Sequence, residues 1–194
     1  TVRGFIALAR FRPGQADEAF RKAIGLDSAS PLARFGLGLA SIRNGDLARG
    51  RNDIEIATGL DPNRSLLRSY LGKAYFAERR EPLAGEQYAI AKELDRRDPT
   101  PWFYDAILKQ SENRPVEALR DLERSIELND NRAVYRSRLL LDKDRASRQA
   151  GVGRIYDDLG FGQLGINEAS RSLTLDPGNA SAHRFLADVY GPES

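Results

Sequence analysis

Small and apolar residues recur every 34 positions along most of the chain. The recurring columns, each read in steps of 34, hold Gly4, Gly38, Gly72 and Ala106; Ala16, Gly50, Ala84 and Ala118; Phe20, Ile54, Tyr88 and Leu122; and Ala23, Ala57, Ala91 and Ser125. A fixed period of this length indicates stacked supersecondary units that bury their apolar faces only against their neighbours. We therefore expect one elongated domain without a single central core.

Within each unit the apolar spacing predicts two helices. Apolar residues at positions 32–42 are three or four residues apart, which places them on one face of a helix. Gly45 then tolerates a left-handed backbone, and Asp46 caps the next helix. That second helix runs to Leu60 and stops before Pro62, because proline cannot continue a helix. Each unit is therefore a helical hairpin, and the predicted fold class is all-α.

The period is interrupted once, after the fourth unit. Gly153 occupies the column of Ala106 but follows it by 47 residues instead of 34, so about 13 residues are inserted. We expect a short helical turn at 133–141 and a break around 142–144. The first helix of the next unit then runs to Leu159.

These columns resemble the tetratricopeptide repeat family, whose 34-residue helical hairpins use small residues at these positions and end in a proline. Pro62 and Pro177 supply that proline, Arg96 and Asp130 replace it elsewhere, and the aromatic residue expected early in the first helix appears only as Trp102. The resemblance implies a right-handed α-solenoid of antiparallel helical hairpins, coiled into a superhelix. The predicted repeats, all in a single domain covering 1–194, are about 1–30, 31–64, 65–98, 99–132 and 146–179, with a final helix at 180–190 and an insertion at about 133–145.

The resemblance also implies where a partner binds, because in this family the first helices line a concave groove that accepts an extended peptide or a helix. The positions of this chain that correspond to the groove are Leu32, Phe35, Leu39, Ile42, Leu66, Ser69, Lys73, Phe76, Thr100, Phe103, Ile107 and Gln110. This surface is apolar at its N-terminal end, which suits an apolar helix or strand from a protein partner or from another copy. Thr1 falls partway into the predicted first helix, so we expect a further segment upstream of it. The alternative to partner binding is that this upstream segment covers the groove.

One ligand class within the family is not expected. Cochaperones that grip acidic chaperone tails carry an asparagine just after the small first-helix column, together with Lys and Arg. This chain has Phe5, Leu39, Lys73 and Ile107 at that column. We therefore expect no binding of an acidic C-terminal tail.

The composition is that of an ordinary soluble globular chain, with 41% hydrophobic and 30% charged residues. No apolar run approaches the roughly 18 residues of a transmembrane helix, so no transmembrane segment is predicted. The absence of cysteine excludes disulfides, thiolate metal sites and a cysteine nucleophile. The net charge is only +2 and no basic stripe is present, so specific nucleic-acid binding is not predicted.

Three motifs that suggest chemistry have a structural explanation. The glycines at 160, 162 and 165 spell G-x-G-x-x-G, but a dinucleotide site needs a preceding strand, and here we expect a helix followed by an inter-helix turn. The only histidine, His183, has no cysteine or histidine partner for a metal ion. The acidic pairs at 142/144 and 157/158 lack the pattern of a calcium loop, so we interpret them as caps, with a hydrolase carboxylate pair as the alternative. We therefore predict no catalytic residue, no cofactor, no metal ion and no enzymatic activity.

The insertion and the residues around it are rich in basic side chains. They are Arg132, Arg136, Arg138, Lys143, Arg145 and Arg148. Such a group indicates a docking site for an acidic partner, with an ordinary solvated helix as the alternative.

Together these observations predict a non-catalytic protein–protein interaction scaffold that binds a partner segment through the groove or the repeat ends. The alternative is an accessory domain of a larger bacterial envelope, secretion or enzyme protein whose activity lies outside this segment. Segments 133–142, 154–160 and 181–188 resemble stretches of bacterial cell-envelope repeat proteins, which implies the periplasm or cell surface rather than the cytoplasm. Unfinished repeat ends also predict self-association by head-to-tail stacking.

Overall fold

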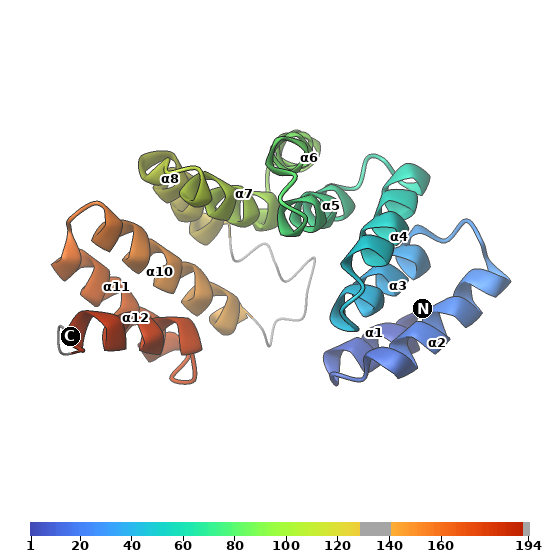
Figure 1. Cartoon of the computed structure of the whole chain (residues 1–194), viewed down its shortest axis with the longest axis horizontal. Coiled ribbons are helices and arrows are strands. Elements are labelled where there is room, and N and C mark those ends of the chain that lie inside the picture. The colour runs from blue at the N-terminus through green and yellow to red at the C-terminus, as the bar shows by residue number, and fades with distance from the viewer. Residues whose placement is uncertain (129–140, 192–194) are drawn as a thin grey trace. The chain divides into compact units, whose positions relative to one another are not determined.

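Every regular element in the described part of the protein is an α-helix. The computed structural model describes residues 1–128 and 141–191, with the backbone alone for residues 141–146. The helices, labelled in Figure 1, are α1 (Val2–Ala9), α2 (Pro13–Leu26), α3 (Pro31–Arg43), α4 (Leu47–Leu60), α5 (Ser65–Ala77), α6 (Glu81–Leu94), α7 (Pro99–Ser111), α8 (Pro115–Glu127), α10 (Leu141–Asp158), α11 (Gly162–Leu175) and α12 (Ala180–Tyr190). The all-α fold class predicted from the sequence is confirmed.

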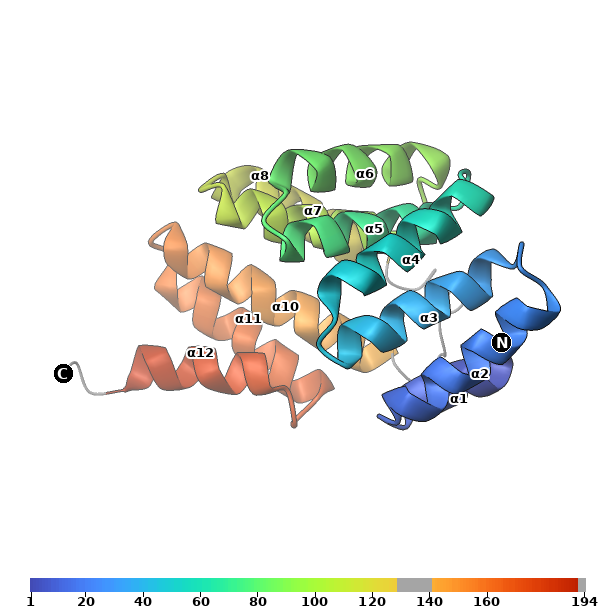
Figure 2. The same ribbon diagram turned by 45° about the vertical axis from the view of Figure 1, so that its right-hand side comes forward.

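The helices form two compact units, Thr1–Asp95 and Arg96–Ser194. In the first unit, α1 pairs with α2, α3 with α4 and α5 with α6, and neighbouring hairpins pack through α2 with α3 and α4 with α5. Figure 2 shows α3 with α4, and α5 with α6, running side by side. In the second unit, α7 pairs with α8 and α10 with α11, while α12 packs against both α10 and α11. Each unit is therefore an α-solenoid of helical hairpins. The assignment of all repeats to one domain stays a prediction.

The helix ends follow the local signals in the sequence. Helix α4 begins at Leu47, where the carboxylate of Asp46 accepts a hydrogen bond from the amide of Arg49 at 3.0 Å. It ends at Leu60, two residues before Pro62. The predicted cap and the predicted stop are both confirmed.

A left-handed residue stands in every described turn between the two helices of a hairpin. Gly45 and Gly160 have φ angles of 90° and 82°, as expected for residues without a Cβ. The same turn position holds Phe11, Arg79 and Asn113, with φ angles of 55°, 59° and 58°. The turn geometry is therefore conserved between hairpins even where the residue is not glycine, at a conformational cost of about 1 kcal/mol for such a residue.

Glycines allow the two helices of a hairpin to cross at close range. A Cβ atom on Gly38 would lie 2.7 Å from the carbonyl oxygen of Gly50, across the α3–α4 crossing. A Cβ atom on Gly165 would lie 2.7 Å from the carbonyl oxygen of Gly153, across the α10–α11 crossing. Real Cβ atoms essentially never show such short distances, so a larger residue at these positions would require the two helices to move apart. This close approach explains the small-residue columns of the sequence.

Helix α10 differs from the expectation for the region after the fourth repeat. It is continuous from Leu141 to Asp158, so the predicted break around 142–144 is wrong. None of those three residues is glycine or proline, and acidic residue types are favoured in a first helical turn, so nothing there interrupts a helix. The short helical turn predicted for 133–141 lies outside the described residues up to position 140. The final helix predicted at 180–190 is confirmed.

Candidate functional site

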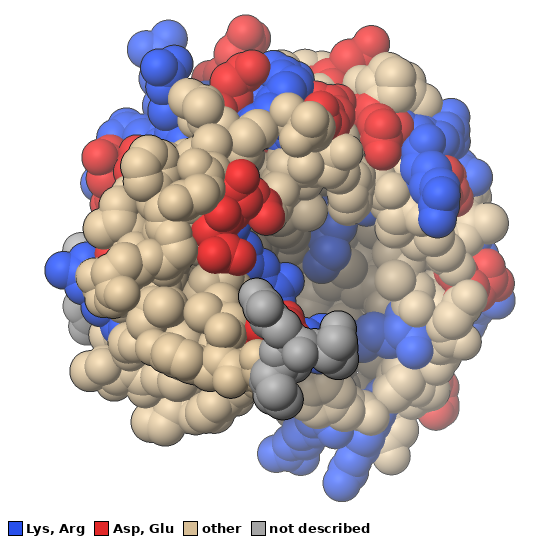
Figure 3. Space-filling view, turned by 60° about the vertical axis from the view of Figure 1, so that its left-hand side comes forward, with Lys and Arg blue, Asp and Glu red and all other residues tan. Residues whose placement is uncertain are grey.

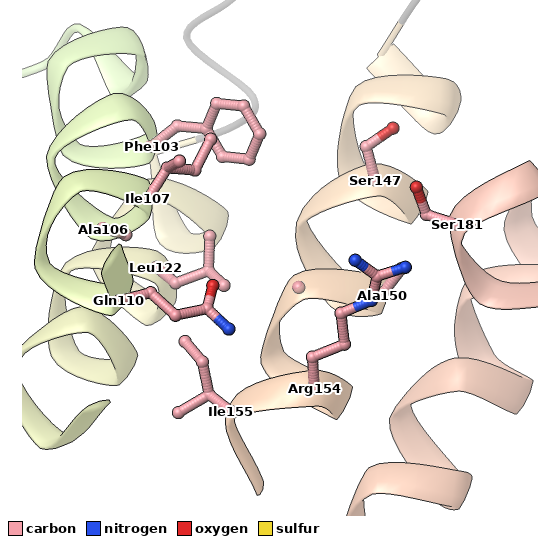
Figure 4. A pocket seen from close by; sticks show the side chains of 11 residues that line it. Phe103, Ala106, Ile107, Gln110, Leu122, Ser147, Ala150, Arg154, Ile155 and Ser181 are labelled. Atoms are coloured by element: carbon pink, nitrogen blue, oxygen red, sulfur yellow. The ribbon is translucent and has the colours of Figure 1, made fainter. Parts of the chain in front are cut away.

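The second unit contains a cavity of about 270 Å³ between its first helices. It is lined by Phe103, Ala106, Ile107 and Gln110 of α7, Leu122 of α8, Ser147, Ala150, Gly151, Arg154 and Ile155 of α10, and Ser181 of α12. Figure 4 shows the α7 side chains on one side and the Arg154 guanidinium on the other, on the side of Ser181. The cavity therefore has an apolar wall and a polar wall.

The apolar wall is part of the core of the unit. Ala106, Leu122 and Ile155 are buried and pack in one cluster with Val152. Ile107, at the mouth of the cavity, is 37% exposed. A partly exposed isoleucine above a buried apolar floor offers a place for a partner's apolar side chain.

A buried arginine, Arg148, packs against Phe103 of this wall. Arg148 is 2% exposed, and its guanidinium carbon lies 5.0 Å from the centre of the Phe103 ring. Its Nε donates a hydrogen bond to the Ser125 hydroxyl at 2.6 Å, and that hydroxyl donates to the Pro99 carbonyl oxygen at 2.9 Å. Arg148 therefore packs inside the unit and is not part of an exposed basic docking site, because its charge is already stacked and hydrogen-bonded. Of the other basic residues in that prediction, Arg132, Arg136 and Arg138 and the side chains of Lys143 and Arg145 lie outside the described part.

Arg154 presents the positive charge of the polar wall. It is half-buried and has no hydrogen bond or ion pair with another described residue. Asp158 lies one helical turn further along α10, but its carboxylate accepts a hydrogen bond from Gln110 Nε2 at 3.2 Å. Arg154 instead extends toward the level of Ser147 and Ser181 (Figure 4). Its guanidinium therefore keeps its donors available to a ligand.

A second, more polar cavity of about 550 Å³ shares Gln110 and Arg154 with the first. Its other lining residues are Asp157, Asp158, Phe185, Asp188 and Val189. Because they share Gln110 and Arg154 as lining residues, the two cavities adjoin, and we call them together the α7–α10–α12 groove. The groove is apolar at one end and carries three carboxylates at the other.

On its inner face the first unit has only a small counterpart of this groove, while a larger cavity of about 670 Å³ lies between α1 and α2 of the first hairpin. A cavity of about 80 Å³ lies among α3, α4 and α5. Next to it the rings of Phe35 and Tyr70 meet edge to face at 5.1 Å, and Phe5 lies 6.4 Å from Phe35. The Lys73 ammonium group lies 5.8 Å from the centre of the Tyr70 ring. Aromatic packing therefore fills most of the inner face of the first unit.

The residues predicted for the groove fall into four groups. Phe103, Ile107 and Gln110 line the groove of the second unit; Leu39, Ile42 and Lys73 line the small cavity of the first; Leu32, Leu66 and Phe76 are half-buried and line neither; Phe35, Ser69 and Thr100 are buried. Phe35 packs with Ile54 and Leu67, and the Ser69 hydroxyl donates to the Ser65 carbonyl at 3.0 Å. Thr100 stands in the first turn of α7, where its amide donates to Asp98 at 2.8 Å. The structure thus places these three side chains within the helical packing and not on a groove surface.

The sequence prediction missed the contribution of α10. When the four predicted groove columns are carried across the insertion by the same 47 residues, they fall on Ser147, Ala150, Arg154 and Asp157. All four line the α7–α10–α12 groove. The repeat signal could therefore have located them, since Arg154 stands in the column of Ile107.

The remaining motifs have structural roles. Gly160 adopts a left-handed turn between α10 and α11, and Gly165 packs against the backbone of Gly153, so the turn-and-packing explanation of the G-x-G-x-x-G pattern is confirmed. His183 is exposed, and its Nε2 lies 2.8 Å from the carbonyl oxygen of Pro177. Among the residues whose side chains the structure describes, 1–128 and 147–191, no group of three His, Cys, Asp or Glu residues is placed to hold a metal ion. No helix in the described part of the chain combines the length and apolar character needed to cross a membrane.

Charge is distributed evenly over the visible surface. On the face drawn in Figure 3, Lys and Arg side chains are interspersed with Asp and Glu side chains, with broad uncharged areas between them. The formal net charge of the whole chain is +2.

The comparisons with known proteins show similarity at the level of structure. No family model and no curated protein matches the sequence. A chain of the APC/C hetero-tetramer Cut9-Hcn1 is similar with a TM-score of 0.85 at 20% identity, over 96% of this chain and 35% of that one. TTC0263, a TPR protein of Thermus thermophilus, gives a TM-score of 0.79 at 14% identity, over 96% and 95% of the two chains. YrrB, described as a TPR protein with an unusual peptide-binding site, gives 0.61 at 18% identity, over 93% and 87%. The fold is therefore that of tetratricopeptide repeat proteins, as the sequence columns predict.

Proposed function

We propose that this chain, which has the tetratricopeptide-repeat fold, is a non-catalytic scaffold that binds an extended segment of a partner protein in the α7–α10–α12 groove. The observation that carries the proposal is the groove itself. It joins an apolar cavity of about 270 Å³ to a polar one of about 550 Å³ on the inner side of neighbouring first helices. Helical repeat proteins use such inner surfaces to bind other proteins.

Among the cavities on the inner faces of the helices, size favours the second unit over the first as the binding surface. Ligand sites commonly have volumes of about 300–1,000 Å³. The two adjoining cavities of the second unit reach that range, whereas the inner cavity of the first unit measures only about 80 Å³. The first unit also has a cavity of about 670 Å³, but it lies between α1 and α2 of the first hairpin, at the end of the repeats. We therefore place the partner segment against α7, α10 and α12.

Display of random dodecapeptides tests this placement. The library is selected on the unaltered chain and on two variants that each replace an exposed apolar residue by glutamate. Ile107→Glu puts a charge at the mouth of the apolar cavity, and Val116→Glu puts the same charge on α8, where Val116 is 52% exposed and lines neither cavity of the groove. Circular dichroism checks that both variants keep their helix content.

The proposal expects peptides that bind the unaltered chain and Val116→Glu equally but bind Ile107→Glu at least about tenfold more weakly, because a charge enters an apolar pocket. Peptides that bind all three proteins equally would show that another surface binds. Failure to enrich any peptide on the unaltered chain over Ile107→Glu would overturn the proposal.

Two further expectations from the sequence remain proposals with their own tests. Self-association through the repeat ends is supported by Val2 and Leu26, which are 73% and 84% exposed on the first hairpin. Sedimentation at several concentrations, repeated with Leu26→Glu, should show an association that the variant weakens. A periplasmic or cell-surface location, and a role as an accessory domain of a larger envelope protein, are tested by cell fractionation and by the full-length gene sequence.

A further inference from the structure

The charges of the groove point to a particular class of peptide. We infer that the partner segment carries an apolar side chain with an acidic residue beside it and a basic residue further along, and that Arg154 receives the acidic one. This inference rests on the proposed function, because it assigns the chemistry of the ligand to the same groove. It concerns a side-chain carboxylate within a peptide and not a C-terminal tail.

The guanidinium of Arg154 has no partner among the described carboxylates near it on α10. A guanidinium at the edge of an apolar cavity is only partly hydrated, and it presents five donors in a fork that matches a carboxylate. Asp157 and Asp158 follow Arg154 by three and four residues on the same helix, a spacing that favours an ion pair. No such pair forms, since Asp158 binds Gln110 and Arg154 extends toward Ser147 and Ser181. The groove thus holds a positive charge that its own carboxylates do not neutralise.

The negative charges of the groove lie at one end of it. Asp157, Asp158 and Asp188 line the polar cavity at the far end of α10 and α12. A second acidic residue of the ligand would meet these carboxylates and be repelled, whereas a lysine or arginine would be attracted. The groove therefore distinguishes the order of charges and does not simply favour acidic peptides.

The geometry of an extended peptide fits the two walls of the groove. Successive side chains of an extended strand point to opposite sides. The two walls face the cavity from opposite sides, with Phe103 and Ile107 on α7 and the Arg154 guanidinium toward Ser181 (Figure 4). A leucine and a neighbouring glutamate can therefore reach the two walls together. One turn of α10 rises about 5.4 Å and two residues of a strand span about 6.6 Å, so a basic residue two positions beyond the glutamate reaches the acidic end.

The inference is tested with two fluorescently labelled synthetic peptides of identical composition. The first contains the core Leu-Glu-Ser-Lys between Gly-Ser flanks, and the second exchanges the charges to Leu-Lys-Ser-Glu. Each core is also made in the reversed order, because the groove does not fix the chain direction. Fluorescence anisotropy measures binding to the unaltered chain, to Arg154→Glu and to Arg120→Glu. Arg120 is an exposed residue of α8 that lines neither cavity, so it serves as the matched charge reversal.

We expect the first charge order to bind about tenfold more tightly than the second in at least one chain direction, because hydrogen bonds to charged groups contribute on this scale. Arg154→Glu should abolish or reverse that preference, and Arg120→Glu should leave it unchanged. The preference should also weaken as salt is raised from 50 mM to 500 mM, because the charges are partly exposed.

The outcomes separate this inference from the proposed function. Equal binding of both charge orders, with loss of binding in Ile107→Glu, would overturn the inference and leave the groove as a peptide site. A charge preference that persists in Arg154→Glu would also overturn it. Absence of binding by both peptides, together with displayed peptides that depend on Ile107 but show no acidic residue beside an apolar one, would refute the inference alone. Absence of any peptide that depends on Ile107 would refute both.

Discussion

The two units of this protein are built from the same helical hairpin, yet their inner faces differ. In the first unit Phe35 is 4% exposed and packs edge to face against Tyr70, and the cavity beside them on the inner face measures only about 80 Å³. In the second unit Phe103, two repeats later in the same column, is half-buried and rests on Arg148 at the wall of a cavity of about 270 Å³. The same residue type at the same repeat position is therefore core in one unit and groove wall in the other.

This difference shows that the position of a residue within the repeat determines the direction of its side chain but not how exposed that side chain is. A first-helix side chain points to the inner face in every hairpin, because the hairpin geometry is constant. Whether it is covered depends on the neighbours in the next repeat. Phe35 packs with Tyr70 and Leu67, whereas Phe103 stacks on Arg148 and shares a cavity with the small residues Ala150 and Gly151 of α10. Large side chains across the inner face fill it, and small ones leave room for a groove.

The largest expected effect comes from truncating the two phenylalanines. Phe35→Ala removes a buried ring and should lower the free energy of unfolding by about 3–5 kcal/mol. Phe103→Ala removes a half-buried ring and its contact with Arg148, for about 1–2 kcal/mol. Urea denaturation followed by circular dichroism measures both. Equal losses would show that the two inner faces are packed alike.

The glycine-mediated helix crossings should respond alike to substitution in both units, because the units differ in their inner faces and not in how the helices of a hairpin cross. Gly50→Ala would place a Cβ 2.6 Å from the carbonyl oxygen of Gly38, and Gly165→Ala would place one 2.7 Å from that of Gly153. Each should lower the free energy of unfolding by about 1–3 kcal/mol, because the backbones must separate.

Gly59→Ala is the matched control for these glycine variants. Gly59 is an exposed helical glycine whose Cβ would meet nothing within 4 Å. This substitution should be stabilising by up to about 1 kcal/mol, because alanine has the higher helix propensity. Hydrogen exchange locates the effect in the altered hairpin. A neutral Gly165→Ala would mean that the α10–α11 crossing is looser than the α3–α4 crossing.

The parts of this fold that the sequence predicted are those governed by local and periodic constraints. Proline, capping side chains and glycine act within a few residues, so the end of α4, the cap at Asp46 and the turn at Gly45 were predictable. The final helix was predictable because its column continued from the previous repeat. The break expected at 142–144 is wrong because a change of repeat register does not require a change of secondary structure, and α10 continues through these residues.

The groove was less predictable because it depends on side chains from three helices. The family resemblance pointed to Phe103, Ile107 and Gln110, which do line it. It also pointed to Phe35, whose burial is decided by Tyr70 in a different repeat. The repeat columns could also have predicted Arg154, but only if they had been continued past the insertion. The absence of an ion pair at Arg154 could not be read from sequence, since its spacing to Asp158 suggests one.

The partly buried ion pairs also differ between the units. In the second, Lys109 Nζ lies 2.6 Å from Asp121 and 3.0 Å from Asp105. In the first, Arg34 lies 3.4 Å from Asp53, and its buried Nε has no hydrogen-bond partner. Lys109→Met should therefore lower the free energy of unfolding by about 1–2 kcal/mol, and Arg34→Met by less, because the better-formed pair loses more.

The pH dependence of Lys109→Met provides its control. Burial lowers the pKa of Lys109, but hydrogen bonds to Asp121 and Asp105 outweigh it, so the pKa rises above the ordinary 10.5. The stability that Lys109 contributes is present below pH 10.5 and is lost as pH rises through the raised value. The unaltered chain and Lys109→Met should therefore converge in stability at alkaline pH. A difference that persisted there would assign the effect to packing of the lysine stem.

The smallest expected effect concerns Asp53, whose carboxylate is the less well paired of the two buried partners. Burial raises the pKa of Asp53 above the ordinary 3.8, opposed by the nearby charge of Arg34. The unfolded chain then releases this proton first, so the contribution of Asp53 to stability falls as pH rises from 3.8 toward the raised value. Asp53→Asn should therefore gain stability in urea denaturation relative to the unaltered chain as pH rises through that window, and Asp188→Asn, which changes an exposed carboxylate of the second unit, should not. A relative loss of stability in Asp53→Asn over the same window would mean that the Arg34 pair dominates over burial, and the ion pairs of the two units would then be alike.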